Sequence, residues 1–113
     1  MKPPTYITMI QEDTIFLRSL SKAAKDKLKA NNIQVSTKYL VDKVILIKEN
    51  MNETLIKLND LGFVFGEDYK QGWSPADIMR DLQEKEELQK PFNSIYWLGP
   101  GQWKLKENKR EKK

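Results

Sequence analysis

Three features of the sequence predict an α+β fold that is mainly helical, with two long N-terminal helices, one short helix and a C-terminal β-hairpin. Apolar residues recur at helical spacing over the first sixty residues, a capping motif begins a further helix at Ser74, and a glycine-rich turn separates two aromatic segments near the C-terminus. A length of 113 residues is typical of one domain. We therefore expect a single α+β domain over residues 1–106 and a flexible basic tail over residues 107–113.

The first helix is expected over residues 9–31. Its apolar residues have helical spacing, Thr8 and Gln11 have the spacing of a capping box, and Asn31-Asn32 is a suitable end. Four cations of this segment share another face at steps i, i+4, i+7 and i+11, namely Arg18, Lys22, Lys25 and Lys29. Two interpretations stay open, a row of phosphate ligands or an ordinary solvated helix face.

Residues 37–61 carry the most regular amphipathic pattern and predict the second long helix. Apolar side chains repeat every three or four residues from Leu40 to Leu61, and Gly62 stands where a helix-ending glycine is expected. The β-branched residues 41–47 could instead form a strand. The apolar stripe favours an intramolecular core, with the seam of a homodimer as the alternative.

The third helix and the hairpin are predicted over residues 75–90 and 94–106. Ser74 and Asp77 form a capping box around Pro75, and Gly99-Pro100-Gly101 supplies the turn between the two strands. This order of helix and hairpin resembles the second half of a winged helix-turn-helix domain. The resemblance implies that helix 75–90 reads DNA bases and that the glycine-rich turn is the tip of a wing. Because this helix is rich in acidic residues, the hairpin, the tail and the first helix are better candidates for contacts with phosphates.

The residue types that are missing exclude several kinds of chemistry. The chain has no histidine and no cysteine, which excludes Ser-His and Cys-His nucleophiles and makes a structural zinc site very improbable. Asp77, Asp81 and Glu84 share a helix face, but no oxygen-rich loop accompanies them, so we interpret them as a solvated acidic face. We expect no enzymatic activity, no metal and no cofactor. No apolar segment approaches the length of a membrane span, so we expect a cytoplasmic protein without a membrane partner.

The charge distribution predicts the function. Residues 104–113 contain six Lys or Arg and two Glu, a balance equal to the net charge of +4 of the whole chain. A basic segment beside aromatic strands is typical of nucleic-acid binding, with phosphates held by cations and bases stacked on rings. We therefore expect a small non-catalytic nucleic-acid-binding or nucleoprotein-associated protein. Its expected ligand residues are Tyr96 and Trp97 for stacking and Lys104, Lys106, Lys109, Arg110, Lys112 and Lys113 for phosphates, with Arg18, Lys22, Lys25 and Lys29 as a second basic surface.

The alternative is a protein-interaction module, either an adaptor or an inhibitor of a larger enzyme. Its interface would be the acidic helix 75–90, the long amphipathic helix 37–61 or the aromatic hairpin, because Trp, Tyr and Phe make strong anchors in interfaces. The partner is then a larger protein, and a homodimer through helix 37–61 is a third possibility. We interpret Trp103 as a core residue.

Overall fold

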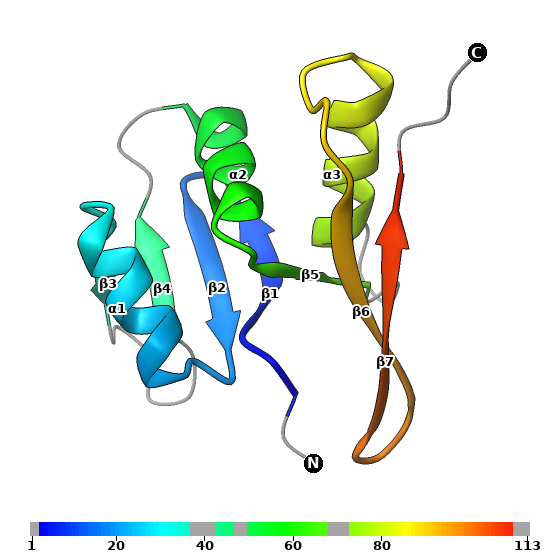
Figure 1. Cartoon of the computed structure of the whole chain (residues 1–113), viewed down its shortest axis with the longest axis horizontal. Coiled ribbons are helices and arrows are strands. Elements are labelled where there is room, and N and C mark those ends of the chain that lie inside the picture. Colours follow the sequence, from blue (N-terminus) through cyan, green and yellow to red (C-terminus); the bar gives the residue numbers. More distant parts are fainter. Residues whose placement is uncertain (1–2, 37–42, 47–49, 68–72, 110–113) are drawn as a thin grey trace.

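The computed structural model describes residues 3–36, 43–46, 50–67 and 73–109 (Figure 1). Within these residues the chain forms one seven-stranded mixed sheet and three helices. The order of strands in the sheet is β3-β4-β2-β1-β5-β6-β7. β5 is parallel to both of its neighbours, β1 and β6, and the other pairs are antiparallel. The strands are β1 (Tyr6–Gln11), β2 (Thr14–Arg18), β3 (Val35–Ser36), β4 (Lys43–Leu46), β5 (Val64–Gly66), β6 (Phe92–Gly99) and β7 (Gln102–Asn108).

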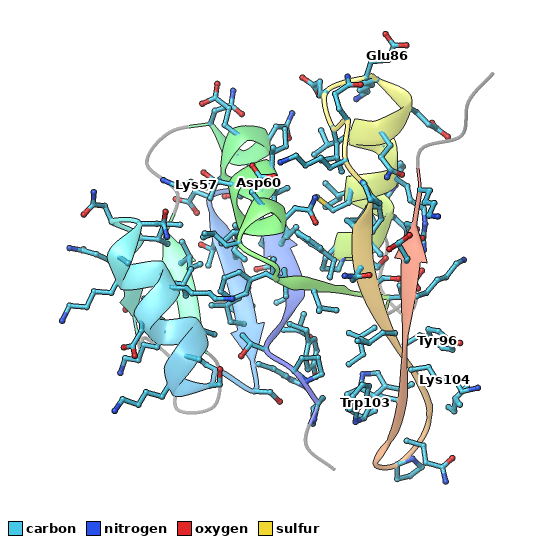
Figure 2. The ribbon with its side chains drawn as sticks, viewed as in Figure 1. Lys57, Asp60, Glu86, Tyr96, Trp103 and Lys104 are labelled. Carbon is cyan, nitrogen blue, oxygen red and sulfur yellow. The ribbon has the colours of Figure 1, made fainter. Side chains whose placement is uncertain are left out.

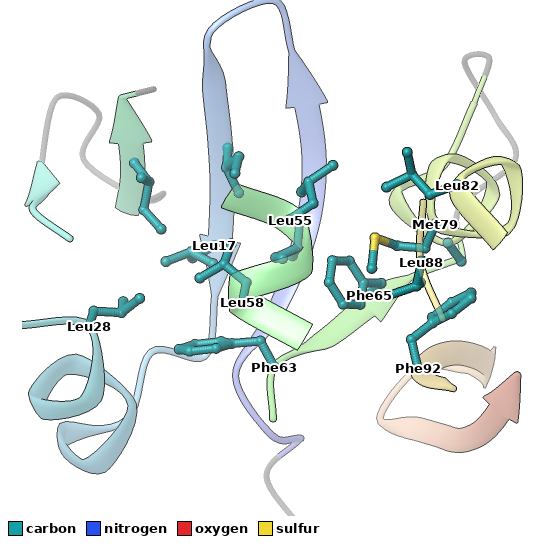
Figure 3. Close-up of a cluster of buried hydrophobic side chains, with 14 residues drawn as sticks. Leu17, Leu28, Leu55, Leu58, Phe63, Phe65, Met79, Leu82, Leu88 and Phe92 are labelled. Carbon is teal, nitrogen blue, oxygen red and sulfur yellow. The ribbon is translucent and has the colours of Figure 1, made fainter. Parts of the chain in front are cut away.

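The three helices are α1 (Lys22–Ala30), α2 (Met51–Asp60) and α3 (Pro75–Glu84), and all three contribute to one apolar core (Figure 3). Leu28, Leu55, Leu58, Met79 and Leu82 come from the helices, and Ile7, Ile15, Leu17, Phe65 and Phe92 come from the sheet. Since neighbouring residues of a strand point to opposite faces, these alternating positions place the helices on one face of the sheet. A smaller apolar cluster of Tyr6, Val64 and Ile95 lies on the other face.

The prediction of a mainly helical chain is wrong, and the first error is the helix expected over residues 9–31. Residues 6–18 form the hairpin of β1 and β2, in which Gln11 pairs with Thr14 across a short turn where Glu12 has a positive φ of 39°. The helix begins only after its N-cap Ser21, whose side chain accepts a hydrogen bond from the Ala24 backbone. Arg18 therefore lies in β2 and does not share a helix face with the lysines of α1.

The long helix expected over residues 37–61 is also wrong. Residues 43–46 form β4, which agrees with the strand alternative, and α2 begins only after its N-cap Asn50. Residues 37–42 and 47–49 lie outside the described part of the chain. The predicted end is correct, because the helix stops at Leu61 and Gly62 has a φ of 90°. Leu55 and Leu58 are fully buried in the core of the same chain, which supports the intramolecular interpretation of the stripe.

The winged-helix resemblance does not describe the fold. The capping box at Ser74 is confirmed, since its hydroxyl accepts from the Asp77 amide and the Asp77 carboxylate accepts from the Ser74 amide. The helix is shorter than expected, however, and ends at Glu84 rather than at residue 90. The strand after it is not a separate wing, because β6 pairs in parallel with β5. β5, α3 and β6 are thus a parallel crossover unit of the seven-stranded sheet.

Gly66 allows β5 to lie close to β1. A Cβ atom on this residue would lie 2.8 Å from the backbone oxygen of Ile7, an atom that cannot move without disturbing the sheet. We expect Gly66→Ala to lower the free energy of unfolding by about 2 kcal/mol, the usual cost of overpacking a well-packed site. Urea denaturation measures this loss. Gly99→Ala is the control, because the nearest atom would be 3.9 Å away, and an equal effect of both variants would contradict the close approach.

Candidate binding surface on the C-terminal hairpin

The hairpin of β6 and β7 is held to the sheet at one end only. β6 pairs with β5 at Ser94 and Ile95, and β7 pairs along the other side of β6 from Asn108 to Gln102. In the described part of the chain, the residues of β6 beyond Ile95 therefore pair only with β7. Figure 1 shows that this end of the hairpin projects past the strands beside it. Gly101 closes the turn with a φ of 72°.

One side of the hairpin combines an aromatic ring with two cations. Tyr96 and Lys104 are direct cross-strand partners, and Lys106 is two residues further along on the same side of β7. Figure 2 shows Tyr96 and Lys104 on the same side, with Trp103 on the opposite one. Both lysines are exposed and Tyr96 is partly exposed. We call Tyr96, Lys104 and Lys106 the basic side of the hairpin.

The other side of the hairpin is apolar. Trp97 and Trp103 are cross-strand partners, and Leu105 is the next residue of β7 on this side. Trp103 packs against the cluster of Tyr6, Val64 and Ile95, so its interpretation as a core residue is partly correct. The ring of Trp97 lies 6.2 Å from that of Tyr6, yet 45% of Trp97 and 48% of Leu105 are exposed. We call Trp97, Trp103 and Leu105 the apolar side of the hairpin.

The structure separates residues that the sequence suggested would act together. Tyr96 and Trp97 point to opposite sides of the hairpin, so they cannot stack on the same stretch of bases. Lys22, Lys25 and Lys29 are exposed on α1, which lies at the opposite end of the molecule from the hairpin (Figure 1). Lys109 follows β7 directly, with its Nζ 3.5 Å from Glu107, and Arg110, Lys112 and Lys113 lie outside the described residues.

A buried polar cluster fixes the base of the hairpin. The guanidinium of Arg80 in α3 pairs with the carboxylates of Glu67 and Asp77 and donates from Nε to Asn108 Oδ1 at 3.3 Å. The Ser94 hydroxyl donates to Glu67 Oε2 at 2.7 Å and accepts from Asn108 Nδ2 at 3.0 Å. The cluster joins the chain after β5 to α3, β6 and β7. Sequence reasoning missed it, and the only local signal was the polar Ser94 between Phe92 and Tyr96 on one side of its strand.

A cleft of about 510 Å³ lies on the outer side of α3, beside this cluster. It is lined by Trp73, Asp77, Arg80, Asp81 and Glu84. Most of its charged groups already have partners, since Asp77 pairs with Arg80 and Asp81 pairs with Lys85 at 2.8 Å. The hydrogen bond and the charge of Asp81 raise the pKa of Lys85 above its usual value. Asp77 and Asp81 of the predicted solvated acidic face are thus held in ion pairs.

Comparison with known proteins gives no relative for this arrangement: no family model, curated protein or solved structure matches the chain. No helix among the described residues is long and apolar enough to cross a membrane. Within the same residues, no group of three or more carboxylates is placed to hold a metal ion.

Proposed function

We propose that this protein is a small non-catalytic nucleic-acid-binding protein whose contact element is the basic side of the hairpin. The observation that supports this proposal is the cross-strand pair of Tyr96 and Lys104, with Lys106 beside it, on a ribbon that projects from the sheet. An aromatic ring flanked by ammonium groups can stack a base while the neighbouring phosphates are neutralised. Lys109 and the basic residues after it extend the positive charge beyond β7.

Single-stranded nucleic acid is the ligand that this geometry favours. The ring of Tyr96 can stack only on a base whose face is free, and bases in a duplex are already stacked on their neighbours. The basic side offers two lysines rather than a long row of cations. The expected affinity is therefore modest and depends strongly on salt, because the release of counterions supplies much of the binding free energy.

The lysines of α1 do not belong to this surface and provide the control. The molecule is 43 Å long and α1 lies at the end remote from the hairpin, so a short strand bound at Tyr96 does not reach α1 (Figure 1). The variants Lys104→Glu with Lys106→Glu, and Lys22→Glu with Lys25→Glu, change the net charge of the protein equally. They differ only in where the charge is reversed.

The test is fluorescence anisotropy with labelled single strands of DNA and RNA about four nucleotides long, at the short end of the usual range of binding sites, so that a strand bound at Tyr96 cannot span the molecule. We expect the hairpin double variant to raise the Kd by about tenfold or more at low salt, and the α1 double variant to leave it nearly unchanged. Tyr96→Ala should raise the Kd by about tenfold, the effect of losing one stacked base. Trp97→Ala, on the apolar side, should have little effect.

Three results would contradict the proposal. Equal losses in the hairpin and α1 double variants would show attraction by net charge without a defined surface. Absence of binding by the wild-type chain at low salt would exclude the function itself. A clear preference for duplexes over single strands would contradict the role of Tyr96 in stacking.

A further inference from the structure

A second feature of the same hairpin is independent of nucleic-acid binding: its outer strand is an exposed sheet edge. β7 is the last strand in the order of the sheet and pairs with β6 on one side over its whole length. In the described part of the chain, no strand pairs with its other side. β7 has seven residues and contains no proline. A long edge of this kind presents alternate N–H and C=O groups to an incoming strand.

The side chains along this edge are apolar on one side, up to Glu107 near the end of β7, and basic on the other. Four large apolar residues are exposed in the described part of the chain, and three of them, Trp97, Leu98 and Leu105, lie in the hairpin. Leu105 and Trp103 lie on β7 itself, so an added strand would bring its own side chains against them. Lys104 and Lys106 line the opposite side at the alternate positions. The edge thus combines a strand side that no other described strand covers with alternating apolar and positive side chains from Trp103 to Lys106.

A second copy of the chain fits this edge poorly. In a symmetric antiparallel pair of β7 strands centred on Leu105, Lys104 lies opposite Lys106 of the other copy. Centring the pair on Lys104 or on Lys106 places that lysine opposite itself, and the registers centred on Trp103 or Glu107, which avoid this clash, pair only three residues of β7 from each copy. Like charges directly opposite each other destabilise strand pairing, and lysines on edges commonly prevent self-association in this way. Charge complementarity points instead to a partner with acidic residues.

We propose that the β7 edge binds an extended segment of another protein in which apolar residues alternate with Asp or Glu. The segment would pair with β7 through its backbone, with its apolar side chains against Trp103 and Leu105 and its carboxylates beside Lys104 and Lys106. Strand addition of this kind takes its affinity from main-chain hydrogen bonds and its specificity from the alternating side chains. Its carboxylates would take the place of phosphates at the basic side, so such a partner competes with nucleic acid for Lys104 and Lys106.

Labelled peptides of about six residues, the length of a typical strand, test the proposal with the full chain. The first alternates Val and Glu, the second has the same composition with the two residue types in separate blocks, and the third alternates Val and Lys. In fluorescence anisotropy we expect the first peptide to bind about tenfold more tightly than the other two, because only it combines strand spacing with opposite charge. Amide exchange in β7 should slow when it binds.

Two variants test whether the Val-Glu peptide binds at the β7 edge. Lys104→Glu with Lys106→Glu should reverse the preference, so that the peptide of Val and Lys binds best. Leu105→Ser, on the apolar side, should weaken the Val-Glu peptide by about fivefold and leave oligonucleotide affinity unchanged, which separates this proposal from the proposed function. Equal binding of the alternating and block peptides would overturn the proposal, as would a wild-type chain that is dimeric in sedimentation and loses its dimer in the Lys104→Glu, Lys106→Glu variant.

Discussion

Replacing Arg80 with methionine is expected to lower the free energy of unfolding by about 3 kcal/mol or more, as when one partner of a buried ion pair is removed. The Glu67 side chain is only 5% exposed and pairs with the guanidinium of Arg80, whose side chain is 30% exposed. Methionine keeps much of the volume of arginine but leaves the Glu67 carboxylate buried without its cation. The variant also loses the bonds from Arg80 to Asp77 and Asn108. Urea denaturation at neutral pH measures the effect.

A double variant tests whether the unpaired charge is the cause. Combining Arg80→Met with Glu67→Gln removes both charges, so we expect it to be more stable than Arg80→Met alone. Lys85→Met serves as a control for the loss of a surface ion pair, because Lys85 is largely exposed and its pair with Asp81 is screened by water. If Arg80→Met and Lys85→Met had similar unfolding midpoints, the cluster would not fix the base of the hairpin as we infer.

Replacing Phe65 with alanine is expected to cost about 4 kcal/mol, within the range for removing a buried aromatic side chain. Phe65 is fully buried on β5, the strand that joins β1 to β6, and its ring lies edge-on to that of Phe92 at 5.9 Å. Figure 3 shows Phe65 and Phe92 together with Met79 and Leu88. A loss of this size is a large part of the stability of a small domain, so the variant is expected to be partly unfolded at 37 °C.

Phe65→Leu keeps the measurement possible if the alanine variant does not fold. Leucine fills much of the same space, and we expect it to cost about 1.5 kcal/mol. Trp73→Ala is the matched control for an aromatic residue on the surface, because 69% of Trp73 is exposed, and it should leave the unfolding midpoint near that of wild type. A Phe65→Ala variant as stable as Trp73→Ala would contradict the role of β5 in joining the two parts of the sheet.

Features that depend on contacts within a few residues were predicted correctly. The capping box of Ser74 and Asp77 closes between residues three apart, and the Gly62 and Gly101 backbones adopt the positive φ values that suit their positions. The pairing of the two strands of the C-terminal hairpin is also local, since a tight turn brings them together. Each of these interactions is complete within one segment, so the rest of the chain cannot easily override it.

The secondary structure of the N-terminal half was predicted wrongly because the spacing of its apolar residues fits both a helix and a strand. Ile10 and Leu17 have helical spacing, but Ile15, Phe16 and Leu17 are buried in succession, as a strand within a sheet allows. What decides between the two is the pairing of β2 with β1 and with β4, and β4 lies some thirty residues away in the sequence. Local propensity carries no information about a partner so distant.

The sequence by itself excluded Ser-His and Cys-His nucleophiles, because it lacks histidine and cysteine, and it showed that the excess of positive charge lies near the C-terminus. Only the tertiary structure decided where those charges lie relative to one another in the described part of the chain. It placed the lysines of α1 away from the hairpin, put Arg18 in β2 and not on their helix, and put Tyr96 and Trp97 on opposite sides of the hairpin. It also brought Glu67, Arg80, Ser94 and Asn108 together from four segments. Such a site depends on strand order and register, which long-range pairing sets and which no single segment contains.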